Sequence, residues 1–191
     1  MRITLLRHGN PELSAWDKIH ASEMPEWIAA YNSTGVERDI SQSCQEMVNE
    51  FEHKFIVCSH LNRSIHSAQM IGYSSPDLVD SIFCEAELPV IPIPMIKLTP
   101  HGWSMVFRVF WFVGVSKKVE SLSSFKSRVS LATEKLVHQA IIHDSVLFIG
   151  HGIINRFLAK ELILKGWIGK ETPNDNKYWG YKYWEYTTYT S

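Results

Sequence analysis

The sequence lacks the features that mark disulfide-bonded, zinc-binding and membrane-spanning chains. Its three cysteines, Cys44, Cys58 and Cys84, are an odd number without C-x-x-C spacing, so neither a disulfide framework nor a zinc site is indicated. The most apolar stretch, residues 103–115, contains Arg108 and is shorter than the roughly 20 residues that a spanning helix needs. The apolar run at the N-terminus is too short for the core of a signal peptide. We therefore expect no transmembrane segment and a reducing, cytoplasmic compartment.

An excess of charge of either sign is also absent. The chain has 19 Lys and Arg against 20 Asp and Glu, a formal net charge of -1. Proteins that bind nucleic acid usually carry a basic excess, so we expect no nucleic-acid partner, and any anion site must be local. The 45% hydrophobic and 20% charged residues are typical of a globular protein, and 191 residues are enough for one α/β domain. We expect residues 1–191 to form a single domain.

Three short apolar runs predict strands, and each run ends in polar residues. They are residues 2–6 before Arg7-His8-Gly9, residues 54–58 before Ser59-His60, and residues 145–149 before Gly150-His151-Gly152. Helical patterns follow the second and third runs, which favours a mostly parallel sheet covered on both faces, a three-layer αβα architecture. Ligands bind beyond the carboxyl ends of such strands. We therefore expect residues 7–9, 59–63 and 150–152 to converge on one crevice.

The other segments predict packing elements around this sheet. Apolar residues at three- and four-residue steps from Leu122 to Ala140 indicate one long amphipathic helix. The segment 88–116 contains four prolines in its first half, which disfavour helix and central strand, so we interpret it as an irregular cap beside the site. Its bulky aromatic residues favour core packing or an apolar mouth. The tail from Lys177 alternates like an edge strand.

Arg7-His8-Gly9 places a potential nucleophile beside an arginine, whose forked guanidinium binds phosphate well. So short a motif occurs by chance in many chains, and a buried structural histidine with a surface arginine is the ordinary alternative. Arg63 and His151, each just beyond another predicted strand, strengthen the catalytic interpretation.

Taken together, these segments resemble the histidine phosphatase superfamily, in its phosphoglycerate-mutase-like branch. The matching pieces are Leu5-Leu6-Arg7-His8-Gly9, residues 58–68 (CSHLNRSIHSA) and Gly150-His151-Gly152. They occur in the order of the family, and the resemblance covers roughly residues 2–165. It implies the phosphoglycerate-mutase-like fold and a phosphatase that hydrolyses a phosphomonoester without metal or other cofactor. The implied substrate is a phosphorylated small molecule.

The resemblance also implies a role for each matched residue. His8 would attack phosphorus and carry the phosphoryl group, so its attacking nitrogen must be unprotonated and we expect a backbone carbonyl to accept from the other ring nitrogen. Arg7, Arg63 and His151 would surround the phosphoryl oxygens and stabilise their charge.

The remaining candidates are less tightly matched. Glu85 aligns best with the carboxylic acid that protonates the leaving group in the family, and Glu87 is the alternative. In an extended segment the two carboxylates would point to opposite sides, so we expect only one to reach the site. Asn10 follows Arg-His-Gly where Thr, Ser or Glu is more typical, and it either donates its amide to phosphate or shapes the turn.

Two other functions fit the same residues. A phosphomutase would hold its phosphoryl group on His8 until a reoriented product takes it back, which requires exclusion of water. A non-catalytic phosphate-binding or regulatory module would keep Arg7 and Arg63 but lack a working acid. The spacings of His60, His66 and His101 match no metal-ligand pattern, so we interpret these residues as structural or site-lining.

Overall fold

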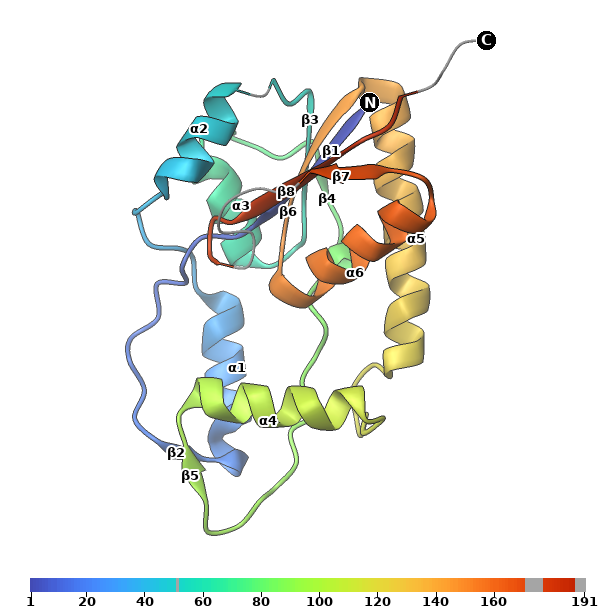
Figure 1. Cartoon of the computed structure of the whole chain (residues 1–191). Helices are drawn as coiled ribbons and strands as arrows, with labels where there is room; N and C mark the ends of the chain where they lie inside the picture. The colour runs from blue at the N-terminus through green and yellow to red at the C-terminus, as the bar shows by residue number, and fades with distance from the viewer. Residues whose placement is uncertain (51, 171–176, 188–191) are drawn as a thin grey trace.

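The computed structural model describes residues 1–50, 52–170 and 177–187, and its centre is a six-stranded sheet (Figure 1). The strands lie in the order β4-β3-β6-β1-β8-β7. Their bounds are β1 Arg2–Arg7, β3 Phe55–Cys58, β4 Leu78–Val79, β6 Ser145–Gly150, β7 Ile168–Lys170 and β8 Tyr181–Glu185. Neighbouring strands from β4 to β1 are parallel, whereas β8 pairs antiparallel with both β1 and β7. The predicted mostly parallel sheet is confirmed.

Helices cover both faces of this sheet (Figure 1). Helices α5 (Leu122–His143) and α6 (Gly152–Leu164) pack on one face, and α2 (Gln42–Glu50) and α3 (Asn62–Met70) on the other. The strands supply both cores by alternation, since Val146 and Phe148 of β6 pack in one core while Leu147 and Ile149 pack in the other. The predicted layers and the long helix α5 are therefore confirmed. None of the helices that the structure describes combines the length and apolar character needed to cross a membrane.

A third apolar cluster forms a cap beyond one end of the sheet (Figure 1). It contains helix α1 (Met24–Ser33), helix α4 (Pro100–Phe112) and a separate two-stranded antiparallel sheet of β2 (Ile19–His20) and β5 (Lys97–Leu98). Two short 3-10 helices, η1 (Ala21–Glu23) and η2 (Ser81–Phe83), complete the described elements.

The prediction of an irregular cap over residues 88–116 was wrong in its second half. Residues 88–96 are irregular, but α4 begins at Pro100. A proline in the first helical turn costs no hydrogen bond, because the N–H groups there have no partner within the helix. Thr99 caps the helix, and its Oγ1 accepts from the backbone N–H of Gly102 at 3.2 Å. The proline that was interpreted as a breaker thus marks the start of a helix.

The prediction of an edge strand in the tail was also wrong. Strand β8 lies between β1 and β7, so both of its sides are paired, and β7 is the edge strand at that end of the sheet. Its register places Glu185 opposite Arg2, and these side chains form an ion pair at 2.8 Å. Residues 188–191 of the predicted strand lie outside the described residues.

Candidate active site

The three predicted polar clusters meet at the carboxyl ends of the parallel strands. The register pairs Arg7 with Gly150 and Cys58 with Ile149, so β1, β6 and β3 end at the same edge of the sheet. A cavity of about 550 Å³ lies there. Residues from all three clusters line it, namely Arg7, His8, His60, Leu61, Arg63 and His151.

His8 is held as a buried, neutral imidazole. Only 2% of the residue is exposed, and its Nδ1 lies 2.8 Å from the carbonyl oxygen of Gly9. Because a carbonyl oxygen only accepts, Nδ1 carries the ring proton and Nε2 keeps its lone pair. Burial above all, and the nearby positive charge of Arg63 and then of Arg7, hold the pKa of His8 well below its usual value, although the bond to Gly9 opposes this. The expected carbonyl contact is therefore present.

His151 faces His8 from the start of α6, with the two ring centroids 5.1 Å apart. Its Nε2 lies 2.6 Å from Ser59 Oγ, and that hydroxyl oxygen already accepts from the N–H of Leu61 at 3.3 Å. The hydroxyl has one proton and two lone pairs, so it can accept from Leu61 and donate to Nε2, and in that arrangement the ring proton lies on Nδ1. Among the described residues, this buried Nδ1 has no hydrogen-bond partner. Burial, followed by the charges of the neighbouring histidines and arginines, holds the pKa of His151 well below its usual value.

The two arginines are held over tyrosine rings. Arg63 is 3% exposed, and its Nη1 donates to the carbonyl oxygen of Tyr31 at 3.3 Å and to Asn32 Oδ1 at 3.1 Å. Its Cζ lies 4.5 Å from the centre of the Tyr31 ring, and Arg7 Cζ lies 4.2 Å from that of Tyr178. Within the described part of the chain, Nε of Arg63 is buried and has no hydrogen-bond partner. Two guanidinium groups are thus fixed beside His8 by aromatic and backbone contacts.

Glu85 lies on the α6 side of the cavity. Its Oε2 accepts from the N–H of Ile153 at 2.9 Å, and its Oε1 accepts from those of Ile154 and Ala86, each at 3.0 Å. A Cβ placed on Gly152 would lie 3.8 Å from Glu85 Oε2 and 3.7 Å from Arg7 Cζ. The carboxylate and the Arg7 guanidinium therefore flank the same small space.

Glu87 lines the same cavity, so both carboxyl-bearing residues reach it, whereas we expected one. The two side chains occupy different positions. Glu87 is exposed, and its Oε2 accepts from the N–H of Glu120 at 3.4 Å, whereas Glu85 is only partly exposed. Glu85 is thus the inner acid and Glu87 the outer one.

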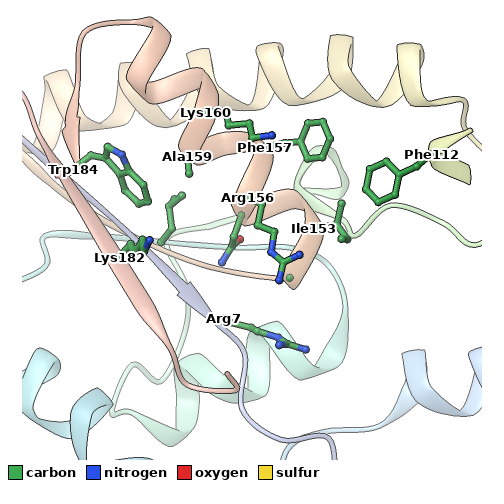
Figure 2. A pocket seen from close by; sticks show the side chains of 12 residues that line it. Arg7, Phe112, Ile153, Arg156, Phe157, Ala159, Lys160, Lys182 and Trp184 are labelled. Carbon is green, nitrogen blue, oxygen red and sulfur yellow. The ribbon is translucent and has the colours of Figure 1, made fainter. Parts of the chain in front are cut away.

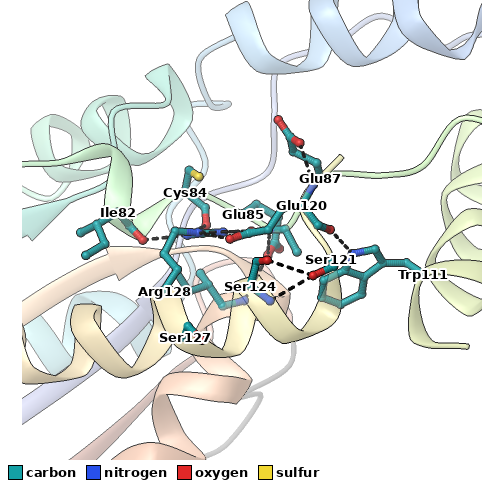
Figure 3. A network of polar contacts seen from close by, with 12 residues as sticks. Ile82, Cys84, Glu85, Glu87, Trp111, Glu120, Ser121, Ser124, Ser127 and Arg128 are labelled. Atoms are coloured by element: carbon teal, nitrogen blue, oxygen red, sulfur yellow. Dashed lines mark hydrogen bonds and ion pairs between the residues drawn. The ribbon is translucent and has the colours of Figure 1, made fainter. Parts of the chain in front are cut away.

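The segment that carries Glu85 is anchored by Arg128 of α5 (Figure 3). Nη1 of Arg128 donates to the carbonyl oxygens of Ile82 at 2.7 Å and Cys84 at 3.0 Å. Its Nε and Nη2 pair with Glu120, with Nη2 2.8 Å from Oε2. One half-buried guanidinium group therefore fixes the backbone just before Glu85.

Gly9, the glycine of Arg-His-Gly, leaves room for a neighbouring aromatic side chain. A Cβ on Gly9 would lie 2.4 Å from Cζ2 of Trp179, whose indole Nε1 donates to the carbonyl oxygen of Asp39 at 2.8 Å. The backbone of Gly9 does not occupy the left-handed region, so close approach rather than a sharp turn explains this glycine. Ser67 Oγ also accepts from the N–H of Gly9 at 2.9 Å.

The structure does not place Asn10 with the other predicted residues. Its amide donates to Glu37 Oε2 at 2.6 Å, and it does not line the cavity. His60 and His101 line the cavity, whereas His66 Nδ1 accepts from the N–H of Val36 at 3.0 Å. Across the described ranges, no group of three or more His, Cys, Asp or Glu side chains is placed to hold a metal ion.

A second cavity, of about 500 Å³, lies between α6 and β8 (Figure 2). Arg7 lines this second cavity, but His8, Arg63 and His151 do not. Its other charged and aromatic lining residues are Arg156, Lys160, Lys182, Phe112, Phe157 and Trp184. Since the potential nucleophile is absent from it, the candidate chemistry belongs to the first cavity.

No protein-family model and no curated protein matches this sequence. Solved structures do match. A mycobacterial glucosyl-3-phosphoglycerate phosphatase in complex with VO3 is 19% identical, with 85% of this chain and 82% of that chain covered and a TM-score of 0.56. YhfR of Bacillus stearothermophilus is 16% identical, covering 86% and 80%, with a TM-score of 0.56. An Escherichia coli protein assigned as a candidate alpha-ribazole-5'-P phosphatase is 15% identical, covering 85% and 79%, with a TM-score of 0.58.

Proposed function

We propose, from the premise that this chain has the phosphoglycerate-mutase-like fold of the histidine phosphatases, that it hydrolyses phosphomonoesters through a phosphohistidine on His8. The observation that carries the proposal is the state of His8 in a cavity with two arginines. Its Nδ1 donates to the carbonyl oxygen of Gly9, so Nε2 is the nucleophilic atom, and the lowered pKa keeps it unprotonated at neutral pH.

Binding of the phosphoryl group relies on donors that the fold fixes in advance. Arg7 and Arg63 supply guanidinium groups, and His151 supplies the Nδ1–H that has no partner among the described residues. A buried N–H without an acceptor is costly, and a phosphoryl oxygen would remove that cost. Because these donors are preorganised, they stabilise the charge on the three non-bridging oxygens as the group moves.

In the first step, Nε2 of His8 forms a bond to phosphorus while the bond from phosphorus to the leaving oxygen breaks. The leaving oxygen takes a proton, which we assign to Glu85 with Glu87 as the alternative donor. Of the two Glu85 oxygens, Oε1 accepts two N–H bonds and Oε2 accepts one, so Oε2 retains a lone pair for the proton. Oε2 is also the oxygen beside the space shared with Arg7.

In the second step, water attacks the phosphoryl group and the bond from phosphorus to Nε2 breaks. The same carboxylate takes a proton from that water, so inorganic phosphate leaves and both His8 and the acid return to their starting states. The N–H groups of Ile153 and Ile154 hold the Glu85 carboxylate in one position. It can therefore give up a proton in the first step and take one in the second without movement of the backbone.

The walls of the cavity favour a substrate with an apolar or aromatic portion. Apolar and aromatic residues line the cavity together with the phosphate donors: Trp27, Ile28, Tyr31, Leu88 and Val90. Trp27 stacks on Tyr31 with the ring centroids 4.9 Å apart, which presents a rigid aromatic surface. The VO3 held by the mycobacterial phosphatase supports an oxyanion in this fold. The three unpaired thiols of Cys44, Cys58 and Cys84 fit the cytoplasm as the compartment.

The test is hydrolysis of an aryl phosphate by the purified chain, with and without a chelator. We expect turnover in both conditions, and a fall of about 10⁴-fold or more in His8→Ala. His138→Ala, at an exposed position of α5, is the matched control and should keep full activity. Full activity in His8→Ala would refute the nucleophile, and loss of activity with chelator would refute the metal-free mechanism. Phosphate binding without turnover by the wild-type chain would favour the regulatory module.

A further inference from the structure

Helix α4 is apolar on its outer as well as its inner side. On the inner side, Trp103 and Phe107 are buried in the cap cluster, and Trp111 is buried in the core that α5 and α6 share. On the outer side, Met105, Val109 and Val113 recur every four residues and are 74%, 61% and 72% exposed. A helix with apolar residues on two opposite sides is typical of one that a further partner covers.

The exposed residues continue beyond this helix. Met95 is 92% exposed and Ile96 is 48% exposed in the turn before β5, and Phe112 is 45% exposed. Within the described residues, six of the thirteen exposed large apolar side chains thus lie between positions 95 and 113. We call these six residues the cap stripe: Met95, Ile96, Met105, Val109, Phe112 and Val113. The segments that carry it lie at the end of the molecule away from both termini (Figure 1).

The segment that carries the cap stripe is basic, although the whole chain is not. Residues 88–119 contain Lys97, Arg108, Lys117 and Lys118 and no Asp or Glu, a balance of +4 in a chain of net charge -1. The acids Glu23 and Glu26 belong to the segment on which α4 packs with its buried side. In the sequence, Lys97 adjoins Ile96 and Arg108 adjoins Val109, so the charged residues nearest to the cap stripe along the chain are basic.

We propose that the cap stripe docks on an anionic phospholipid surface, with its apolar side chains in the interface and Lys97 and Lys117 near the headgroups. Exposed apolar side chains flanked by lysines are the composition that binds such surfaces without spanning them. A second copy of the chain fits less well. In a two-fold dimer the same surface meets itself, so the basic segment would face its own copy.

Docking at this surface would bring the catalytic cavity near the membrane. Ser104 and Arg108 of α4 line that cavity, on the helix row next to the cap stripe. The surface proposal does not depend on the proposed reaction, because binding to vesicles is measured without turnover.

The test is sedimentation of the full chain with vesicles of phosphatidylcholine alone or with phosphatidylglycerol added. We expect binding to the anionic vesicles, weakened by salt, and little binding to phosphatidylcholine alone. Met105→Ser with Val109→Ser should lower the affinity about tenfold or more, since both side chains lose their apolar contact. Lys97→Gln with Lys117→Gln should lower the affinity for anionic vesicles about thirtyfold, because each lysine near such a surface raises the affinity about fivefold.

The matched control is Leu131→Ser with Ile141→Ser, which removes two side chains of α5 that are 58% and 63% exposed. This variant should bind vesicles like the wild type. Sedimentation velocity gives the mass of each variant, and circular dichroism with thermal melting shows that it is folded. The proposal is overturned by a wild type that ignores anionic vesicles, by equal loss in the control, or by a wild-type dimer that Met105→Ser with Val109→Ser converts to a monomer. The last result would mean that the cap stripe binds a second copy of the chain.

Discussion

Ser59 Oγ lies 2.6 Å from Nε2 of His151, and this contact joins the loop after β3 to the N-terminus of α6. We infer that the hydroxyl, which also accepts from the N–H of Leu61, donates to Nε2 of His151 in this contact. The proton then lies on Nδ1, which has no other partner in the described chain. In the proposed mechanism, Ser59 would thus prepare the Nδ1–H of His151 as a donor for the phosphoryl group.

Replacing this serine should weaken the binding of the transition state more than the binding of the substrate. We expect Ser59→Ala to lower kcat by about tenfold to a hundredfold with a smaller change in KM, since the imidazole loses its fixed tautomer. Ser59→Thr, which keeps the hydroxyl, should recover most of the activity. Steady-state kinetics with an aryl phosphate checks this, and equal losses in Ser59→Ala and Ser59→Thr would assign Ser59 to packing alone.

The acid is tested by the choice of leaving group. Glu85→Gln should lower kcat/KM about a hundredfold for an alkyl phosphate, whose alkoxide needs a proton, and less than about tenfold for a nitrophenyl phosphate, whose phenolate does not. Glu87→Gln is the matched control and should affect both substrates equally. If the selective loss occurs in Glu87→Gln instead, the outer carboxylate is the donor.

The buried histidines make stability depend on pH. In the folded chain the pKa values of His8 and His151 lie well below 6.5, so below about pH 6.5 the unfolded chain binds protons that the folded chain does not. These two residues should therefore lower the stability as pH falls from about 6.5 towards their folded pKa values, by at most about 1.4 kcal/mol per pH unit for each residue. Above about pH 7.5 they should contribute nothing.

Urea unfolding between pH 5 and pH 8 measures this dependence. The double variant His8→Gln with His151→Gln should lose less stability on acidification than the wild type, because it lacks both groups. Parallel curves for the two proteins would show that neither histidine is held neutral in the folded chain.

Gly9 should be intolerant of a methyl group. In Gly9→Ala the new Cβ would meet Cζ2 of Trp179 at 2.4 Å, so we expect a loss of about 1 to 3 kcal/mol in the free energy of unfolding, together with reduced activity. Trp179→Leu also costs stability, but it should relieve the clash. A double-mutant cycle by denaturant unfolding should therefore give a favourable coupling between the two substitutions. Additive effects would show that the ring does not limit the space at Gly9.

The sequence was most informative where a local pattern carried the structure. Each apolar run before Arg7, Ser59 and Gly150 forms a strand as predicted, because a buried parallel strand must be apolar on both faces. The convergence of the three polar clusters could be predicted from the parallel arrangement of these strands alone. Helix α5 was predicted because its apolar spacing is sustained over many turns.

Features that depend on distant contacts could not be predicted. Tyr31 and Tyr178 lie under the guanidinium groups of Arg63 and Arg7, but nothing near either tyrosine in the sequence indicates this. The place of β8 inside the sheet depends on its pairing with β1, and alternation does not specify a partner. Asn10 lies only two residues after His8, yet its amide reaches Glu37 instead of the cavity. Closeness to His8 in the sequence therefore did not predict where the Asn10 side chain points.

The central claim is that His8 carries the phosphoryl group, and trapping that intermediate tests it most directly. The chain is mixed with an aryl phosphate, quenched in alkali within one turnover, and digested for mass spectrometry. We predict one added phosphoryl group on the peptide that contains His8, with none in His8→Ala. Turnover at the normal rate with no modified peptide, or with the group on another residue, would contradict the mechanism.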